Sequence, residues 1–342
     1  MEAGPTSHSY TSQRLKLHYD DWGNPDAPPL LLLHGGRDHS RNWDWTARAL
    51  RNDWHIIAPD WRGHGDSQWS ADGEYKMLTY LYDLAQLIHQ QRLAPVTIVA
   101  HSMGGNIATR YAGLYPDHVR KLVAIEGLGA SPKMLAEREA VDFAERTRSW
   151  IDKKRAASAR TPRRYPTLEA ALQRMMDENR HLSEEQARHL TIHGVNQNED
   201  GTYGWKFDPY LNIWGDSDMT QAQIETLWSR ITAPTLLLYG ANSWASNPQT
   251  DGRIAHFNTA RVSVYENAGH WLHHDQFAQF IAEIGAMQSG GDQDGDGFFR
   301  HARSQECLDE RREKEAVGDR AGDIADDDAS GSCVLGEGVK RE

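Results

Sequence analysis

The sequence predicts an α/β protein with a doubly wound, mostly parallel sheet and a helical segment inserted into it. Continuous apolar runs of strand length recur along the chain and end abruptly at glycine or polar residues, as strands buried on both faces do. Segments with helical spacing of apolar residues separate several of these runs. A charged, helix-rich block without any such run interrupts the series. A length of 342 residues suits one large domain carrying such an insertion.

The expected elements alternate along the chain. Residues 14–22 alternate apolar and polar side chains and are expected to form an antiparallel edge strand. The expected strands of the parallel sheet are 29–33, 54–59, 96–101, 119–125, 234–239 and 260–265, and the runs 29–33 and 54–59 are typical of strands buried on both faces. The expected core helices are 75–92, 103–115 and a closing amphipathic helix over 271–286.

Composition divides the chain into four parts. Residues 1–13 are expected to be a flexible N-terminus, and 14–129 with 232–287 form the α/β core. Residues 130–231 are expected to form a mostly helical cap, with helices over Met134–Lys154 and Leu168–Glu178 and a capping signal at Leu182-Ser-Glu-Glu. The tail, 288–342, is rich in Gly, Asp, Arg and Glu and is expected to be disordered and acidic.

Charge and cysteine content narrow the possible partners. The net charge of −12 argues against nucleic acid or an anionic membrane surface as a partner. The two cysteines, Cys307 and Cys333, both lie in the tail, so no disulfide framework is expected. No secretory signal and no apolar run of membrane-spanning length is visible, so we expect a cytoplasmic protein acting on a small molecule. The sequence leaves open whether it forms a homo-oligomer.

One stretch of the tail, Asp292-Gln-Asp294-Gly-Asp296-Gly297, matches the start of a calcium-binding loop. The twelfth position of that loop is Arg303, where a bidentate Glu would be needed. An acidic linker is therefore the better interpretation, and we predict neither a metal nor a cofactor.

The strongest candidate for chemistry is Ser102. The apolar run from Val96 stops at this serine, and a helix-compatible segment follows. Ala100-x-Ser102-x-Gly104 fits a strand–turn–helix nucleophile elbow, with Ala in place of the usual first Gly. Small residues are needed there because the strand and the helix meet at a strained turn, and the helix N-terminus offers free N–H groups beside the hydroxyl.

Four motifs in order then resemble the α/β-hydrolase superfamily over about 14–287: His34-Gly35-Gly36, Asp60-x-Arg-Gly-His-Gly-x-Ser67, His101-Ser102-Met103-Gly104-Gly105 and Ala268-Gly269-His270. The resemblance implies an eight-stranded-type sheet with a cap and a serine nucleophile. A serine at the elbow disfavours the dehalogenase and epoxide-hydrolase branches, which resemble this chain but use a carboxylate nucleophile. The Asp60–Ser67 segment is expected to be structural.

The resemblance also assigns the rest of a catalytic triad. His270 is the expected base, and the neighbouring His273 and His274 are expected to be surface or packing residues. The usual acid position reads Gly240-Ala241-Asn242-Ser243 and holds no carboxylate. A second known location is the end of the preceding strand, where this chain has Glu126. We expect Glu126 to be the acid; the alternative is a Glu paired with a cap arginine.

The remaining expected site residues form the oxyanion hole and the substrate pocket. The backbone N–H groups of Met103 and of Gly36, with Arg37 as the alternative to Gly36, are expected to form the oxyanion hole. Expected substrate-binding residues are Arg37, His101, Trp205, Trp214 and Trp271. In the insertion, Trp205, Phe207, Tyr210 and Trp214 could line an apolar pocket or form the cap's own small core.

The expected function is a cofactor-independent serine hydrolase that cleaves a small carboxylic ester, thioester or lactone through a Ser-His-Glu triad and an acyl-enzyme. Two alternatives stay open. One is hydrolysis of a carbon–carbon bond, or perhydrolysis, with the same triad. The other is a catalytically silent ligand-binding homologue, suggested by the missing Asp at position 243.

Overall fold

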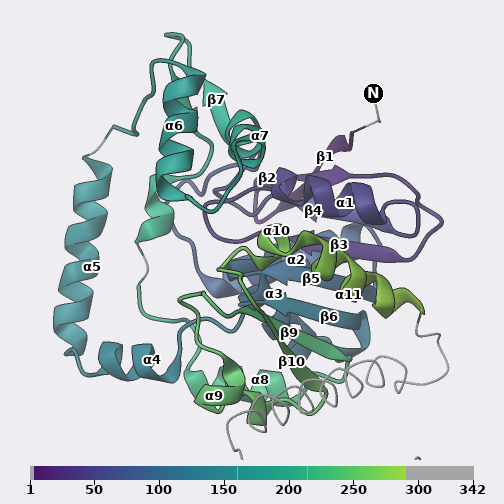
Figure 1. Cartoon of the computed structure of the whole chain (residues 1–342). Coiled ribbons are helices and arrows are strands. Elements are labelled where there is room, and N and C mark those ends of the chain that lie inside the picture. Colours follow the sequence, from purple (N-terminus) through teal and green to yellow (C-terminus); the bar gives the residue numbers. More distant parts are fainter. Residues whose placement is uncertain (1–3, 160, 214, 290–342) are drawn as a thin grey trace, which may run out of the picture. The chain divides into compact units, whose positions relative to one another are not determined.

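An eight-stranded sheet forms the centre of the protein (Figure 1). The computed structural model describes residues 4–159, 161–213 and 215–289. The strand order is β1-β2-β4-β3-β5-β6-β9-β10, and every neighbouring pair from β4 to β10 is parallel. The strands of this sheet are β1 Thr6–Ser12, β2 Leu15–Asp21, β3 Pro29–Leu33, β4 His55–Pro59, β5 Val96–His101, β6 Val119–Ile125, β9 Thr235–Gly240 and β10 Ala260–Tyr265. Each of the six strands expected for the parallel sheet is therefore present within a residue or so at each end.

The first strand corrects one expectation. Residues 6–12 form β1, which pairs antiparallel with β2 and takes the edge position predicted for 14–22. Two buried side chains hold β1: the Tyr10 ring lies 6.2 Å from that of Tyr19, and Ser12 Oγ donates to the buried Asp83 at 2.6 Å. Tyr10 is the only one of these residues with a large ring that can be buried, and the others are polar, so composition alone suggested a flexible segment.

The core helices cover both faces of the sheet. They are α1 Asp44–Leu50, α2 Met77–Gln90, α3 Met103–Leu114, α8 Gln221–Ser229, α9 Pro248–Asp251, α10 Leu272–Asp275 and α11 Phe277–Ser289. Buried residues of α2, α3 and α8 join one hydrophobic cluster with alternate strand residues such as Leu31 and Leu33. Helices α1 and α11 lie on the other face (Figure 1).

The inserted cap is mostly helical, and it connects β6 to β9. Its helices are α4 Pro132–Glu139, α5 Phe143–Ser158, α6 Leu168–Glu178 and α7 Glu184–Gly194, and its hairpin pairs β7 Val195–Gln197 with β8 Tyr203–Trp205. The helix predicted over Met134–Lys154 is two helices, because Asp142 starts a new one by accepting from the Ala144 N–H at 2.9 Å. Helix α8, although inside 130–231, packs on α3 through Ile224 and Trp228 and belongs to the core.

The predicted closing helix over 271–286 is also divided, into α10 and α11. His273 and His274 are buried, and both Nε2 atoms lie near Asn42 Oδ1, at 3.2 and 2.7 Å. Of the two expected roles, surface or packing, the structure assigns both histidines to packing.

The predictions for the tail, including the calcium-like loop and both cysteines, lie outside the described residues. Within the ranges that the structure describes, no helix combines the length and the apolar character required to span a membrane.

Candidate active site

The turn between β5 and α3 places Ser102 at the carboxyl end of the sheet. Its backbone adopts φ 51° and ψ −114°, a strained conformation that non-glycine residues rarely take. The helix comes so close that a Cβ on Gly104 would lie 2.6 Å from the His34 carbonyl oxygen. A Cβ on Gly105 would lie 2.7 Å from Gly127 Cα. The small residues around Ser102 are therefore required by backbone contacts.

Glu126 and His270 meet beside this turn. Glu126 directly follows β6, has φ 49° and is 5% exposed. Its Oε2 contacts His270 Nδ1 in a short hydrogen bond and accepts from Ser243 Oγ at 2.6 Å. Its Oε1 accepts from the Gly240 N–H at 2.9 Å. Both carboxylate oxygens thus have donors, which offsets the cost of burying the charge.

The loop that carries His270 rests on His101. The His101 ring is 2% exposed, and its Nε2 donates to the His270 carbonyl oxygen at 2.9 Å. Burial, followed by the nearby His270, lowers the pKa of His101 well below its usual value, so its ring stays neutral. The ring borders the cavity described below, but its hydrogen bond supports the His270 loop.

The two expected oxyanion-hole residues lie next to each other. A Cβ on Gly36 would be 3.8 Å from Met103 Sδ, so the loop after β3 approaches the start of α3. Met103 is the first residue of α3, where backbone N–H groups have no partner within the helix. The alternative residue, Arg37, has φ 60° and is exposed beside the same cavity.

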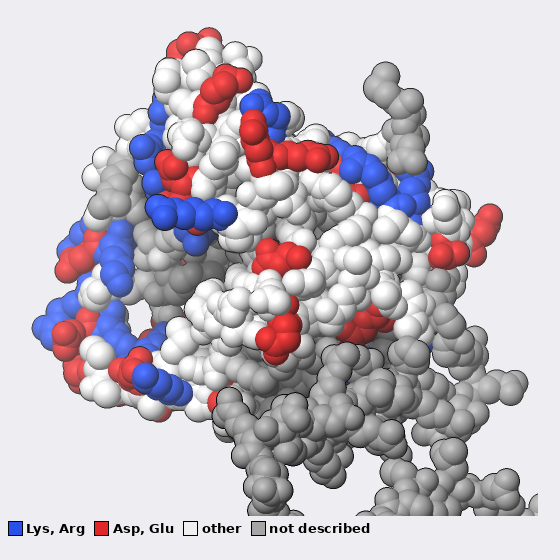
Figure 2. Space-filling model, in the orientation of Figure 1, with Lys and Arg blue, Asp and Glu red and all other residues white. Residues whose placement is uncertain are grey.

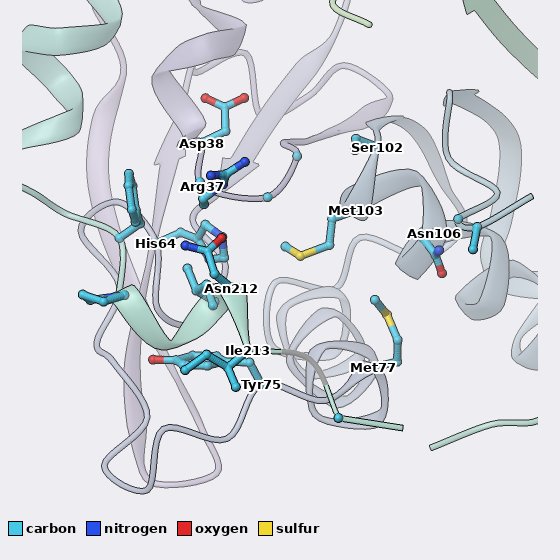
Figure 3. A pocket seen from close by; sticks show the side chains of 18 of the residues that line it. Arg37, Asp38, His64, Tyr75, Met77, Ser102, Met103, Asn106, Asn212 and Ile213 are labelled. Atoms are coloured by element: carbon cyan, nitrogen blue, oxygen red, sulfur yellow. The ribbon is translucent and has the colours of Figure 1, made fainter. Parts of the chain in front are cut away.

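A cavity of about 1700 Å³ lies between the core and the cap, and Ser102, His270 and Glu126 all border it. Figure 3 shows Met103 from α3 and Met77 from the start of α2 projecting into the same space. This volume exceeds that of an ordinary small-ligand pocket. The site can therefore accommodate a substrate much longer than an acetyl ester.

The structure places the expected aromatic pocket residues differently from one another. Trp205 and Trp271 border the cavity, as does Phe207. Trp205 also packs in the cap's own cluster and donates from Nε1 to Tyr165 Oη at 3.1 Å, so both roles considered for it apply. Trp214 lies outside the described residues.

Tyr210 is not among the described residues that border the cavity. Its ring packs against the core cluster, and Lys154 Nζ lies 5.0 Å from the ring centre.

Trp244 was not predicted as a site residue. Its ring is 68% exposed and lies 4.9 Å from the ring of His270. The sequence offered one indication that Trp244 lies near the site: it stands two residues beyond Asn242, in the loop after β9.

The segment after β4 is structural, as expected. The Asp60 carboxylate accepts from the backbone N–H groups of Ser40 and Asp66, at 2.7 and 2.9 Å. The Arg62 guanidinium binds the buried Asp83 at 2.6 and 2.7 Å. These contacts attach the segment to the core, and its His64 and Gly65 border the same cavity as Ser102.

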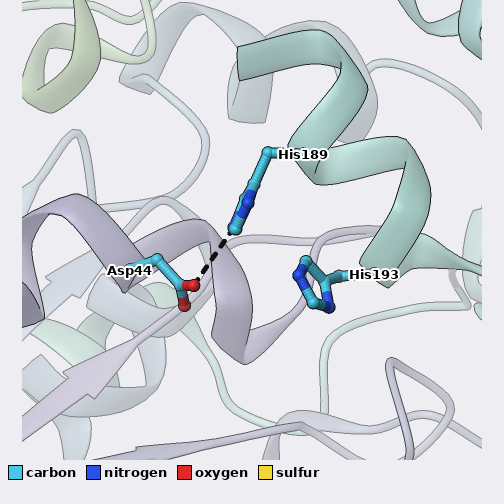
Figure 4. A group of neighbouring side chains, drawn as sticks. All are labelled: Asp44, His189 and His193. Carbon is cyan, nitrogen blue, oxygen red and sulfur yellow. Dashed lines mark ion pairs between the residues drawn. The ribbon is translucent and has the colours of Figure 1, made fainter. Parts of the chain in front are cut away.

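Outside this site, Asp44, His189 and His193 lie close enough together to be considered as metal ligands (Figure 4). Arg41 already binds both oxygens of Asp44, at 2.8 and 2.7 Å, and its Nη1 lies 3.4 Å from His193 Nδ1. A second cation there would be repelled by the guanidinium. The cluster instead joins α1 of the core to α7 of the cap, since His189 Nε2 lies 3.2 Å from Asp44 Oδ2.

Basic side chains gather on the cap side of the cavity (Figure 2). Most of them have acidic partners: Arg138 and Arg146 share Asp216, at 2.8 and 3.2 Å, and Lys154 lies 3.3 Å from Glu74. These ion pairs hold α4 and α5 against neighbouring loops.

The chain matches the family model described as alpha/beta hydrolase fold over residues 28–277. That match covers more than half of the chain, so the protein belongs to the alpha/beta hydrolase family.

Its curated relatives are named as hydrolases. A serine hydrolase-like protein of Danio rerio is 30% identical over 222 residues, covering 64% of this chain and 66% of that protein. Esterase Rv0045c of Mycobacterium tuberculosis is 26% identical over 75% of this chain and 80% of its own length. The sn-1-specific diacylglycerol lipase ABHD11 of Mus musculus is 28% identical over 77% of this chain and 81% of its own length.

Solved structures agree on the fold. The thioesterase domain from the curacin biosynthetic pathway superposes with a TM-score of 0.71 at 24% identity, covering 82% of this chain and 99% of that one. At this identity the likeness establishes the fold alone.

Proposed function

We propose that the protein is a serine hydrolase that cleaves carboxylic esters, with Ser102 as nucleophile, His270 as base and Glu126 as the acid that orients His270. The observation that carries the proposal is the hydrogen bond between Glu126 Oε2 and His270 Nδ1 at the wall of the cavity that Ser102 also borders. Named relatives that are esterases and a lipase support ester hydrolysis as the reaction.

In this mechanism Ser102 Oγ attacks the ester carbonyl while His270 Nε2 takes its proton. The N–H groups of Met103 and Gly36 stabilise the oxyanion of the tetrahedral intermediate. His270 then protonates the departing alcohol, leaving an acyl group on Ser102, and later removes a proton from the water that hydrolyses it. Glu126 fixes the tautomer of His270 and stabilises its charged form.

The missing carboxylate at position 243 has a physical explanation within this proposal. Ser243 Oγ donates to Glu126 Oε2 and the Gly240 N–H donates to Oε1, so the loop after β9 binds the acid instead of supplying it. A carboxylate at 243 would face Glu126 and repel it.

A fluorophosphonate probe and p-nitrophenyl ester turnover test the proposal together. We expect the wild type to be labelled and to turn over esters, and Ser102→Ala to lose labelling and at least about 10⁴-fold in kcat, because removing a triad nucleophile costs factors of this order or more. Ser158→Ala, at an exposed serine of α5, is the matched control and should keep both.

If the folded wild type is neither labelled nor active on any ester, the protein is a silent homologue and the proposal fails. Labelling that persists in Ser102→Ala would also overturn it, because another nucleophile would then be responsible.

A further inference from the structure

A buried arginine borders the cavity without an acidic partner. Arg110 lies on α3 and is 5% exposed. Its Nη1 donates to the Asn106 carbonyl oxygen at 2.8 Å, and its Nε is buried with no hydrogen-bond partner among the described residues. Within those residues no carboxylate oxygen lies within the 4.0 Å that defines an ion pair with it. The guanidinium therefore has donor capacity left unused.

This arrangement differs from that of three other arginines that border the cavity. Arg138, Arg146 and Arg174 are paired with acidic residues. Burying a cation without a counter-charge is costly, and such groups in proteins are normally paired. Burial lowers the pKa of Arg110 to about 10, so it is still charged near neutral pH.

Burial lowers the pKa of Arg110, and the negative charge of Asp218 opposes this shift. Asp218 Oδ2 accepts from the Leu78 N–H at 2.8 Å, and its Oδ1 is buried without a partner. Asp218 therefore lies outside contact distance of the guanidinium. A purely structural Arg110–Asp218 pair is the competing explanation, and the experiment below distinguishes it.

Arg110 lies on the same side of α3 as Ser102. Ser102, Asn106 and Arg110 are spaced four residues apart, so they follow one face of the helix, and all three border the cavity. Helical side chains lean toward the N-terminus, and the bond to the Asn106 carbonyl shows that this one does. With a rise of 1.5 Å per residue, the guanidinium lies about 6–9 Å along the helix from Ser102.

We propose that Arg110 binds a carboxylate of the substrate, so that the substrates are esters carrying a carboxylate about 6–9 Å from the scissile carbonyl. This inference rests on the proposed function, because it assigns a substrate class to the same site. A carboxylate would fill the open donor positions of the guanidinium with charge-assisted hydrogen bonds.

Paired substrates test the inference directly. One series consists of p-nitrophenyl monoesters of adipic, pimelic and suberic acids, each compared with the p-nitrophenyl ester of the fatty acid of the same chain length. A second series carries the carboxylate on the alcohol, as in 6-acetoxyhexanoate against hexyl acetate, followed by pH-stat. The measured quantity is the ratio of kcat/KM for the carboxylate ester to that for its neutral partner.

In at least one series we expect the wild type to prefer the carboxylate ester by about tenfold or more, and Arg110→Met to lower that ratio by about 10- to 100-fold, the usual effect of one hydrogen-bonded charge pair. Arg110→Lys keeps the charge and should retain part of the preference. Arg155→Met is the matched control, at an exposed arginine of α5 paired with Asp152, and its ratio should equal that of the wild type.

Failure of the inference and failure of the proposed function look different. Ser102-dependent turnover without a carboxylate preference in either series would overturn the inference and leave the function standing. Equal losses on both members of each pair in Arg110→Met, with a lower melting temperature, would also overturn it, because they indicate a structural pair with Asp218. Absence of Ser102-dependent turnover of every ester would remove the function itself.

Discussion

Helices α3 and α5 both border the cavity, but the protein holds them in opposite ways. Ten of the twelve residues of α3 are buried, and its first turn touches β3 and the loop after β6 through backbone atoms. None of the sixteen residues of α5 is buried. The residues proposed for chemistry come from the core side, where backbone packing fixes their positions, while the cap supplies a wall.

The contacts of the cap wall explain this contrast further. Helices α4 and α5 are attached by partly exposed ion pairs such as Arg138–Asp216. Pairs of this kind contribute about 0–1 kcal/mol each, because water screens them and long side chains lose freedom in forming them. The ion pairs of α4 and α5 therefore contribute less to their positions than backbone packing contributes to that of α3.

Because α3 is held by backbone packing, a substitution at its start is expected to lower the free energy of unfolding strongly. In Gly104→Ala the new Cβ would lie 2.6 and 2.7 Å from the carbonyl oxygens of His34 and Leu33. Neither backbone oxygen can rotate away, so we expect the free energy of unfolding to fall by about 3 kcal/mol or more, at the upper end of overpacking effects. Urea unfolding measures it.

Two control variants, in which no backbone clash is expected, accompany Gly104→Ala. Gly285→Ala in α11 places its Cβ in open space and should raise stability by about 0.5–1 kcal/mol, the helix propensity difference. Met134→Ala, at an exposed position of α4, should change stability by less than about 0.5 kcal/mol. An equal loss in all three variants would contradict the proposed difference between core and cap.

The contact between Asp44 of the core and His189 of the cap is expected to have an intermediate effect on the free energy of unfolding. Although burial opposes the shift, hydrogen bonds from His189 and Arg41 lower the pKa of Asp44 to about 2. A lowered carboxyl pKa stabilises the fold above the unfolded pKa, near 4, and this contribution is lost as the pH falls toward 2. We expect Asp44→Asn to cost about 2 kcal/mol at pH 7.

Urea unfolding of both proteins at pH 7, 5, 4 and 3 measures this difference. The gap between the wild type and Asp44→Asn should be constant above about pH 5 and should shrink below pH 4. A gap that does not depend on pH would show that the charge of Asp44 contributes nothing to joining the cap to the core.

The sequence predicted the sheet core well because continuous apolar runs of strand length that end at Gly or polar residues are typical of strands buried in a parallel sheet. The edge strand β1 was missed, because it is held by its pairing with β2 and by the contact of Ser12 with the distant Asp83, which its polar sequence does not indicate. The break between α4 and α5 was missed because the charged run gave no clear end signal before Asp142.

For the candidate site, the positions of the main residues could be predicted from the sequence, but the contacts of their side chains could not. Ser102, Glu126 and His270 each follow a strand of a parallel sheet, so their approach at one edge follows from topology. The hydrogen bonds from Gly240 and Ser243 to Glu126 and the isolation of Arg110 depend on side-chain placement across distant segments. Sequence patterns carry no signal for such contacts.

The identity of the acid is the central claim, and kcat of Glu126→Gln tests it most directly. Glutamine keeps the shape but loses the charge, so we expect kcat to fall about 10³- to 10⁴-fold, as for the acid of other triads, with KM little changed. Glu126→Asp should be intermediate, and Ser243→Ala, which removes one hydrogen bond to Glu126, should lose about tenfold or less. A folded Glu126→Gln with kcat within tenfold of the wild type would contradict the claim.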